Sequence, residues 1–475
     1  MPGIFGLISS QSPETSKLQL QTMLATMQHE DFYHHGTYTN ELMGIFSGWI
    51  SHKNSFSDCM PLSHEQENVS IIFSGEAFID LDTLNELKVK CSGINFNNAK
   101  HLIWLYKKYS DAFIEMLNGW FSGILIDLRL KKVILFNDRY GVERIYYYED
   151  KEGFYFASEA KALLSIFPHL RQLDFASVGE VLSFGCVIQN KTLFPSIKLL
   201  PGGSKWSFSK PYALKKESYF VPSQWENQET LDKDSYYHKL KETFTTILPR
   251  YLQSNRKMGM SLTGGIDARL IMAWVKLPPG ELPCYTFGGL YRDCRDVLVA
   301  RRVAALCRQP HETILAGNEL LRDFPFLAEK CVYISDGTMD VSGAVELFIN
   351  KLARQIAPVR LTGNYGSEIV RGNIAYKPHP PCMDFFTPDM QQNIQNASNT
   401  YAREANCNRM TFIAFKQVPW HHFARLSIEQ SQLSMRSPYL DNDLVAMMYR
   451  APADQLTSSL PSLKLVAEGN IDLSR

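Results

Sequence analysis

The sequence predicts a mixed protein in which an α+β part is followed by an α/β part with a parallel sheet. Two observations carry this prediction. Up to about residue 210, short runs of β-forming residues alternate with turn residues, as at 69–73, 121–126 and 132–136. From about residue 235, strand-like runs instead alternate with longer helical patterns, which is the order of a parallel sheet with helices on both faces.

The elements of the second part follow one another in a regular order. A helical pattern covers residues 235–252, and a strand with a glycine-rich turn follows at 258–265. A strand at 284–287, a helix at 297–306 and a strand at 359–361 come next. Ligands of such sheets bind at the carboxyl ends of the strands, so the glycine-rich turn lies at a predicted binding edge.

Two predicted domains, 1–212 and 235–475, are joined by a linker at 213–234, where proline and polar residues break the pattern. The composition fits globular domains that bury large cores, because 45% of the residues are hydrophobic and 21% are charged. The formal net charge is zero, which excludes a general electrostatic attraction to nucleic acid or to an acidic membrane.

Cysteine usage and the lack of long apolar runs favour a soluble, cytoplasmic protein. Nine cysteines are scattered without a Cys-x-x-Cys pair, which argues against a disulfide framework or structural zinc. No run reaches the ~20 apolar residues that a membrane span needs. The first residues also lack the basic and apolar regions of a signal peptide.

The most informative segment is the turn 263–267, which follows a short strand and opens a helix. Gly264 and Gly265 let the backbone approach an anion without a Cβ in the way, and the amides at the helix start point at that anion. Asp267 is a candidate Mg²⁺ ligand, because Mg²⁺ prefers one or two carboxylates together with phosphate oxygens. The turn predicts an ATP or pyrophosphate site, although it lacks the Walker pattern G-x-x-x-x-G-K-S/T. The alternative is an ordinary strand-to-helix turn.

Eight motifs are spread over the chain. Five lie in the first part, MPGIFG, FSGE, LNGWF, NDRYGV and FASEAKAL, and three in the second, TGGID, TGNYGSE and RSPYLD. In order and spacing they resemble glutamine-dependent asparagine synthetases, over nearly the whole chain. The resemblance implies an N-terminal Ntn-hydrolase-type αββα sandwich, followed by a C-terminal adenosine α-hydrolase-like (PP-loop) domain with a parallel sheet.

The N-terminal motifs depart from that family where the glutamine site would be. The family's nucleophilic cysteine corresponds to Pro2, which has no thiol. The arginine that clamps the glutamine carboxylate aligns with Glu30, and an oxyanion-hole amide becomes Ser74. The aspartate that reads the glutamine amine aligns with Asn98. The resemblance therefore implies that the scaffold persists while glutamine hydrolysis is lost.

The C-terminal motifs retain more of the family's pattern. In the family the Gly-Gly turn holds ATP, AMP is transferred to a carboxylate, and an amine then attacks the acyl-adenylate. Carried over, Asp267 and Glu368 would bind Mg²⁺ and Lys464 would stabilise acyl transfer. The implied nucleotide-binding residues are Ser261, Thr263, Gly264, Gly265, Asp267, Arg292 and Gly363. Alternatives are a solvated lysine for Lys464 and a salt-bridged helix start for Arg292.

Tyr365 is the most suggestive departure in this half. β-Lactam synthetases, which close a ring with the substrate's own amine, have a tyrosine before Gly-Ser-Asp, and Tyr365 precedes Gly-Ser-Glu here. A neutral tyrosine partnered by a carboxylate can help to deprotonate an attacking amine, so Tyr365 is a candidate catalytic residue. The alternative is a core tyrosine whose hydroxyl caps a loop.

The function expected from the resemblance is ATP-dependent amide formation through an acyl-adenylate, in amino-acid biosynthesis, with ATP and Mg²⁺ as cofactors. Ammonia or a substrate amine would replace glutamine as nitrogen donor. The acceptor would be aspartate or another small-molecule or peptide carboxylate, and a homodimer is possible. One alternative is an intramolecular cyclase of β-lactam synthetase or lasso-peptide cyclase type. Another is a non-catalytic nucleotide-binding homologue, which Ala268 and the early end at Arg475 favour.

Overall fold

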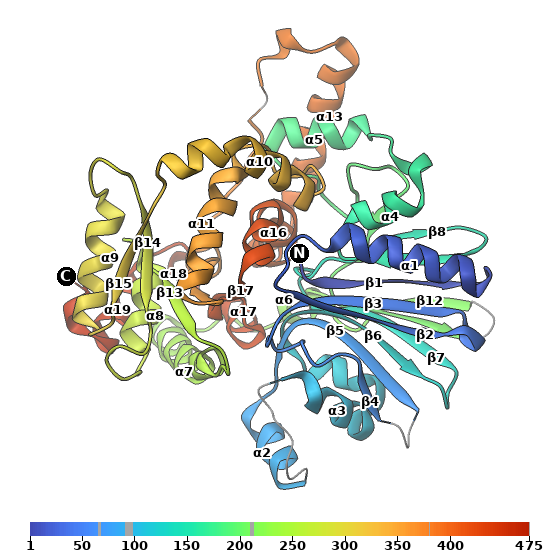
Figure 1. Ribbon diagram of the computed structural model, residues 1–475. Helices are drawn as coiled ribbons and strands as arrows, with labels where there is room; N and C mark the ends of the chain where they lie inside the picture. The colour runs from blue at the N-terminus through green and yellow to red at the C-terminus, as the bar shows by residue number, and fades with distance from the viewer. Residues whose placement is uncertain (65–67, 91–97, 210–212, 380, 475) are drawn as a thin grey trace.

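The computed structural model describes the chain except for residues 65–67, 91–97, 210–212, 380 and 475 (Figure 1). Three sheets organise it: two antiparallel sheets in the N-terminal half and one parallel sheet in the C-terminal half. The mixture of α+β and α/β classes predicted from the sequence is therefore present. Among the described residues, no helix is long and apolar enough to cross a membrane.

The first sheet has the strand order β10-β8-β9-β1-β3-β2. Its strands are β1 (Gly3–Ser9), β2 (Tyr33–Asn40), β3 (Ile45–His52), β8 (Tyr146–Glu149), β9 (Gly153–Ala157) and β10 (Lys198–Leu199). Helices α1 (Pro13–Met27) and α4 (Ala160–Ile166) cover its outer face, where Leu20 and Met23 of α1 pack on Phe5 and Leu7 (Figure 1).

The second sheet faces the first and has the order β12-β11-β7-β6-β5-β4. Its strands are β4 (Leu62–His64), β5 (Val69–Phe78), β6 (Asn118–Asp127), β7 (Lys132–Asn137), β11 (Ser204–Ser209) and β12 (Ala213–Ser218). Helices α2 (Leu81–Lys90) and α3 (Leu102–Tyr109) lie on its far side (Figure 1). Ile4 and Ile45 of the first sheet share a core with Ile72 and Ile124 of the second. The N-terminal half is thus an αββα sandwich, the layer order that the motifs implied.

The predicted linker needs correction at its start. Residues 213–218 form strand β12, which pairs with β11 from Ser204↔Ser218 to Ser209↔Ala213. The strand is at the sheet edge and its side chains are mostly exposed, with Lys215 and Glu217 forming an ion pair. Charged residues are typical of edge strands, because they discourage pairing with other chains. In sequence such a polar edge strand is hard to distinguish from a linker. The short helix α6 (Ser223–Glu226) follows.

The third sheet is parallel, in the order β15-β14-β13-β16-β17, with β13 at its centre. Its strands are β13 (Met258–Ser261), β14 (Cys284–Gly288), β15 (His311–Leu315), β16 (Val359–Thr362) and β17 (Ser434–Arg436). Met260 and Leu361 are completely buried, as expected where helices cover both faces. This sheet has the parallel α/β architecture that the motifs implied.

The helices that cover the third sheet follow the predicted alternation. Asp232 caps the first of them by accepting from the amides of Asp234 and Ser235, which explains its start two residues before the predicted one. The helices of this half are α7 (Lys233–Leu252), α8 (Ile266–Trp274), α9 (Arg295–Leu306), α10 (Asn318–Ile334), α11 (Gly343–Ile356), α12 (Gly366–Arg371), α13 (Pro388–Ala405), α14 (Arg409–Phe412), α15 (Val418–His421), α16 (Phe423–Gln432), α17 (Asn442–Met448), α18 (Ala453–Leu456) and α19 (Leu460–Gly469).

The two halves are joined by packing as well as by the chain. Helix α5 (Phe175–Phe184) of the first half packs on α13 of the second at one end of the molecule, where Phe184 contacts Tyr401 (Figure 1). At the centre, the Asn118 side chain donates to Asp441 over 3.0 Å, and Arg436 pairs with Glu76 over 2.7 Å. The space between the sheets of the two halves is therefore lined by both.

Candidate functional site

The Gly264–Gly265 turn lies at the carboxyl edge of the parallel sheet. Strand β13 ends at Ser261, and α8 begins at Ile266 with Gly265 as an N-cap that has no side-chain cap. The Gly264 amide donates to Asp296 Oδ1 over 3.0 Å, and the Gly265 amide donates to Thr263 Oγ1 over 3.2 Å. The first amide thus already holds a carboxylate, as expected at an anion-binding helix start. A phosphate would have to displace the exposed Asp296 side chain.

Asp267 is held by an arginine that the sequence did not single out. The guanidinium of Arg371, at the end of α12, donates to Asp267 Oδ1 over 2.6 Å and to Oδ2 over 2.9 Å. Both side chains are largely buried, with 14% and 16% exposed. Burial raises the pKa of Asp267, and the guanidinium opposes that shift. A bidentate pair of this kind is among the stronger charge-assisted contacts in proteins.

Two glycines that follow β16, Gly363 and Gly366, pack closely against Asp267 and Ala268. A Cβ on Gly366 would lie 2.5 Å from Asp267 Cγ, and one on Gly363 would lie 2.9 Å from the Ala268 amide nitrogen. The Tyr439 hydroxyl donates to the Asp267 carbonyl over 2.8 Å. The motifs TGGID, TGNYGSE and RSPYLD, far apart in sequence, therefore meet around Asp267.

The predicted magnesium site does not match this geometry. Both Asp267 oxygens accept from Arg371, so a divalent cation there would face a guanidinium. Glu368 accepts from Ser367 Oγ over 2.7 Å and lies 3.4 Å from His422 Nε2. Within the described part of the chain, no group of three His, Cys, Asp or Glu side chains is arranged to hold a metal. While the Arg371 pair is intact, the Asp267 oxygens are occupied, and the assignment of Asp267 and Glu368 to Mg²⁺ stays a prediction.

Tyr365 lies between the two halves of the protein. It precedes α12 with a left-handed φ of 69°, which is unusual for a bulky residue and typical of functional loops. Its ring makes edge contacts with Trp120 of β6, at 5.7 Å between centroids, and with His422, at 5.5 Å. Burial raises the pKa of Tyr365 well above 10, with the negative charges of Glu429 and Glu368 adding to the shift, so its hydroxyl is neutral. His422 is neutral too, because burial lowers its pKa to about 4.

The other predicted residues are spread around this centre or away from it. Ser261 ends β13, and Arg292 is exposed in the loop between β14 and α9. Lys464 is exposed on α19, with its ammonium 3.8 Å from the centroid of the Tyr237 ring on α7. The structure thus brings together Gly264, Asp267, Gly363 and Glu368 with Tyr365, and places Lys464 against another helix.

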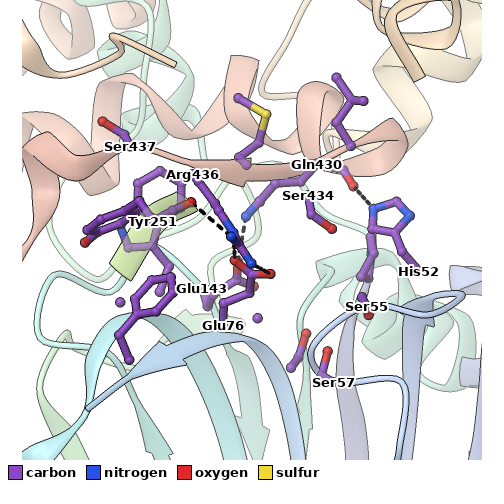
Figure 2. A pocket seen from close by; sticks show the side chains of 18 residues that line it. His52, Ser55, Ser57, Glu76, Glu143, Tyr251, Gln430, Ser434, Arg436 and Ser437 are labelled. Atoms are coloured by element: carbon purple, nitrogen blue, oxygen red, sulfur yellow. Dashed lines mark hydrogen bonds and ion pairs between the residues drawn. The ribbon is translucent and has the colours of Figure 1, made fainter. Parts of the chain in front are cut away.

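A separate cavity of about 60 Å³ lies beside Pro2 and Ser74, two positions that the resemblance places at the glutamine site (Figure 2). Pro2, Ser74 and Gly75 line it, together with Trp120 and Arg436. Figure 2 shows the Arg436 guanidinium meeting the Glu76 carboxylate, at 2.7 and 3.1 Å, across the centre of the view. Among the described residues that line it there is no cysteine, and Arg436 and Glu76 form an ion pair in its wall.

Two residues that were aligned with the glutamine site do not line this cavity. Glu30 does not line the cavity: it binds Lys330 at 2.8 Å and accepts from Gln432 at 2.7 Å. His52, at the end of β3, lines the cavity instead, and its Nε2 faces the Gln430 carbonyl oxygen at 2.9 Å (Figure 2). Asn98 also lies outside the cavity and caps a turn by accepting from the Lys100 amide. Asn98 lines the neighbouring cavity, which shares Ser55 with this one.

Glu143 is a buried acid on the wall of the same cavity. Gln430 Nε2 donates to its Oε1 over 2.6 Å, whereas Gln430 Oε1 is buried with no partner. Burial, reinforced by the charge of Asp138, raises the pKa of Glu143 to about 8. The folded protein thus keeps this carboxyl protonated at neutral pH, while the unfolded chain releases the proton near the ordinary value of 4.5. Stability must therefore fall as the pH rises from about 4.5 to about 8.

We expect Glu143→Gln to remove the loss of stability between about pH 4.5 and pH 8. The carboxamide has no proton to release, and it can donate to the unpartnered Gln430 Oε1. At pH 8 the variant should gain about 2 kcal/mol in its free energy of unfolding, with little change at pH 4.5. Urea denaturation at both pH values measures the difference. The exposed Glu115→Gln is the matched control, and an equal gain for Glu143→Gln at both pH values would contradict the assignment.

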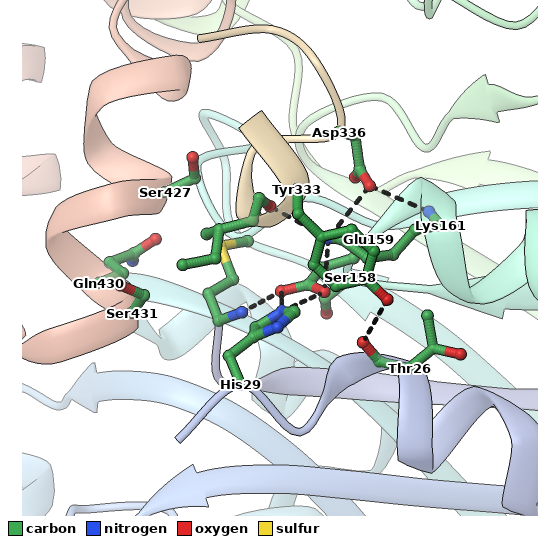
Figure 3. A network of polar contacts seen from close by, with 12 residues as sticks. Thr26, His29, Ser158, Glu159, Lys161, Tyr333, Asp336, Ser427, Gln430 and Ser431 are labelled. Atoms are coloured by element: carbon green, nitrogen blue, oxygen red, sulfur yellow. Dashed lines mark hydrogen bonds and ion pairs between the residues drawn. The ribbon is translucent and has the colours of Figure 1, made fainter. Parts of the chain in front are cut away.

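A second buried cluster surrounds the first residue (Figure 3). The Met1 ammonium and the Lys161 ammonium both bind Glu159, and His29 Nε2 contacts the same carboxylate at 2.8 Å. Asp336, from the C-terminal half, accepts from the backbone amides of Ala160 and Lys161 and pairs with the Lys161 ammonium at 3.1 Å. Asp336 thereby caps α4 from across the interface and holds the halves in register.

Sequence reasoning missed Arg371, His422 and Glu143. Arg371 stands three residues after Glu368, where the motif TGNYGSE ends, so no motif includes it. Glu143 directly follows the NDRYGV motif and precedes Arg144, so the local sequence gives no signal that it is buried. Nothing in the local pattern around His422 predicts its neighbour Tyr365.

Comparisons with known proteins agree with the motifs. A family model for the glutamine amidotransferase domain matches residues 1–220, and one for asparagine synthase matches residues 239–461. Asparagine synthetase (glutamine-hydrolyzing) 1 of Bacillus subtilis is 24% identical over 67% of this chain, and a probable asparagine synthetase (glutamine-hydrolyzing) of Schizosaccharomyces pombe is 23% identical over 77%. The matches span 50% and 64% of these relatives' own lengths.

Proposed function

Because the chain belongs to the asparagine synthetase family, we propose that it is an ATP-dependent amide-forming ligase that does not hydrolyse glutamine. It would activate a carboxylate, aspartate or a similar one, as an acyl-adenylate and transfer the acyl group to ammonia or a substrate amine. The observation that carries the proposal is the meeting of three family motifs around Asp267 at the carboxyl edge of the parallel sheet.

The turn supplies the nucleotide site in this proposal. The amides of Gly264 and Gly265 would hold phosphate oxygens, with the start of α8 behind them. Arg371 is the cation fixed at the turn, and it would offset phosphate charge from its place beside Asp267. The family uses ATP, and Mg²⁺ normally accompanies it. In this chain the Asp267–Arg371 pair does not fit a metal, so no step is assigned to one.

The acyl-transfer site would lie beside Tyr365. The His422 imidazole lies next to both the Tyr365 ring and the Glu368 carboxylate, and the tyrosine and the histidine are neutral. This set of three side chains can accept the proton of an attacking amine. Lys464, whose ammonium lies on Tyr237, takes no part in this proposal.

A second candidate, a nucleotide-binding homologue without catalysis, is favoured by one observation. Gly264 and Asp267 are both already engaged, by Asp296 and Arg371. In that case a bound nucleotide would have to displace Asp296 from the Gly264 amide and separate Asp267 from Arg371. No reaction would follow.

An assay of both half-reactions tests the proposal. We expect ATP–pyrophosphate exchange with at least one carboxylate of an aspartate-based panel, and product with ammonium. With glutamine, we expect no release of glutamate above a buffer blank, because Pro2 has no thiol. Pro2→Cys should not restore release, since Ser74 and the Arg436–Glu76 pair remain in the cavity.

The Bacillus subtilis relative provides the positive control for glutamate release. Glutamate release by the wild-type protein would contradict the loss of glutaminase activity. If no carboxylate supports exchange while ATP still binds, the non-catalytic candidate replaces the ligase.

A further inference from the structure

A second, larger cavity of about 720 Å³ opens between the two halves, next to the one in Figure 2 and sharing Ser55 with it. Lys53 and Asp58, just after β3, form one wall. Arg256 and Lys257, just before β13, and Arg354, near the end of α11, form the other. We call it the basic cleft. Its volume is within the range of small-molecule sites.

The basic cleft carries an uneven charge. Four cationic side chains line it against one carboxylate, Asp58, an excess of three positive charges. The formal net charge of the whole chain is zero, so this excess is local. Lys53 and Lys257 are exposed at the rim, while Arg256 and Arg354 are half-buried.

The nearest carboxylates are already occupied. Asp58 accepts from the Asn54 amide at 2.5 Å, from Ser51 Oγ at 3.3 Å and from His34. Outside the cleft, Glu76 binds Arg436 and Glu30 binds Lys330. Among the described residues, the cleft therefore has one carboxylate of its own, which is held by its loop and by β2 and β3.

The two guanidiniums are anchored by neutral partners. Arg354 donates to the Gln432 carbonyl at 2.7 Å, and its guanidinium carbon lies 3.6 Å from the centroid of the Phe32 ring. Arg256 donates to Ser434 Oγ at 2.9 Å. Among the described residues, neither arginine forms an ion pair. These contacts fix the two groups without pairing either of them directly with a carboxylate.

The titration of nearby groups reflects this positive potential. Burial, together with the charge of Arg354, lowers the pKa of Arg256 to about 10. Burial, together with the charges of Arg354 and Arg256, lowers the pKa of His52 well below 6.5. An anion bound in the cleft would raise the pKa values of both Arg256 and His52.

We propose that the basic cleft binds a small anion with two or three negative charges, such as a phosphate ester or a tricarboxylate. Two fixed guanidiniums suit paired oxyanion contacts, and the rim lysines add attraction at longer range. The walls come from both halves, so a bound anion would bridge them. The site contains none of the residues around Asp267, and the proposal stands independently of the ligase function.

Calorimetric titration with inorganic phosphate and with citrate, at constant ionic strength, tests the proposal. We expect saturable binding of at least one probe to the wild-type protein. Arg256→Gln should weaken it at least about tenfold, the size expected for one charge-assisted hydrogen bond. Lys257→Gln, at an exposed position where folding is not at risk, should weaken it about threefold. Arg302→Gln, exposed on α9, is the matched control and should bind like the wild type.

The two probes also distinguish the two classes of anion. Tighter binding of phosphate would indicate a phosphate ester, and tighter binding of citrate would indicate a tricarboxylate. Absence of saturable binding of both probes would overturn the proposal. So would equal affinities of the wild type, Arg256→Gln and Lys257→Gln. If Asp267→Asn weakens phosphate binding and Arg256→Gln does not, the anion binds at the Gly264 turn and the basic cleft is not its site.

Discussion

Asp267→Asn is expected to lower ATP–pyrophosphate exchange by at least about a hundredfold, the effect of losing one preorganised electrostatic contact. Asp267 holds Arg371 through both carboxylate oxygens, at 2.6 and 2.9 Å. Asparagine offers a single oxygen and no charge, so the guanidinium is no longer fixed beside the Gly264 turn. The proposed counter-charge for the phosphates then loses its position.

Two further variants sharpen this test. Arg371→Gln removes the same pair from the other side and should lower exchange by a similar factor. Asp293→Asn, which removes an exposed partner of Arg301 in the neighbouring loop, is the control and should keep exchange within about twofold. Exchange near the wild-type rate in both Asp267→Asn and Arg371→Gln would place the nucleotide elsewhere.

Glu159→Gln is expected to lower the free energy of unfolding by about 3–5 kcal/mol, the range for removing one partner from a buried ion pair. Only 2% of the Glu159 side chain is exposed, and it binds both the Met1 ammonium and Lys161. Without its charge, these two cations would have Asp336 as their remaining buried carboxylate in the cluster. Denaturant titration at pH 7 measures the loss. Glu242→Gln, from an exposed pair with Lys239, is the control.

The loss of stability in Glu159→Gln should become smaller at low pH. Burial alone would raise the pKa of Glu159, but the charges of His29, Lys161 and the amino terminus outweigh burial and lower it. A lowered carboxyl pKa stabilises the fold above the unfolded value, near 4.5, and this stabilisation is lost as the pH falls through the folded pKa. The difference between the wild type and Glu159→Gln should therefore shrink below about pH 4.5. A difference that stays constant down to pH 3 would contradict this account.

The amino-acid pattern was sufficient for the elements and the architecture. Helix α7, predicted at 235–252, spans Lys233–Leu252, because its apolar residues recur with the helical period and Asp232 caps its start. The Gly264–Gly265 turn was recognisable because a strand, two glycines and a helix follow one another locally. Eight ordered motifs then implied both the αββα sandwich and the parallel sheet. Edge strand β12 was missed because its polar side chains resemble those of a linker.

The contacts that define the site could be seen only in the folded chain. Asp267 and Arg371 are 104 residues apart, and Asp336 caps a helix that begins 176 residues earlier. Glu30 was aligned with the glutamine site, yet it binds Lys330 of the other half. Lys464 was carried over from the resemblance, and in the structure its ammonium lies on the Tyr237 ring. Periodicity and turn chemistry depend on residues close in sequence, so the sequence by itself determined the elements, the fold class and the position of the turn. Ion pairs and buried charges depend on which distant side chains packing brings within about 4 Å, so only the tertiary structure decided the partners of Asp267, the Arg436–Glu76 pair in the cavity beside Pro2 and the basic cleft.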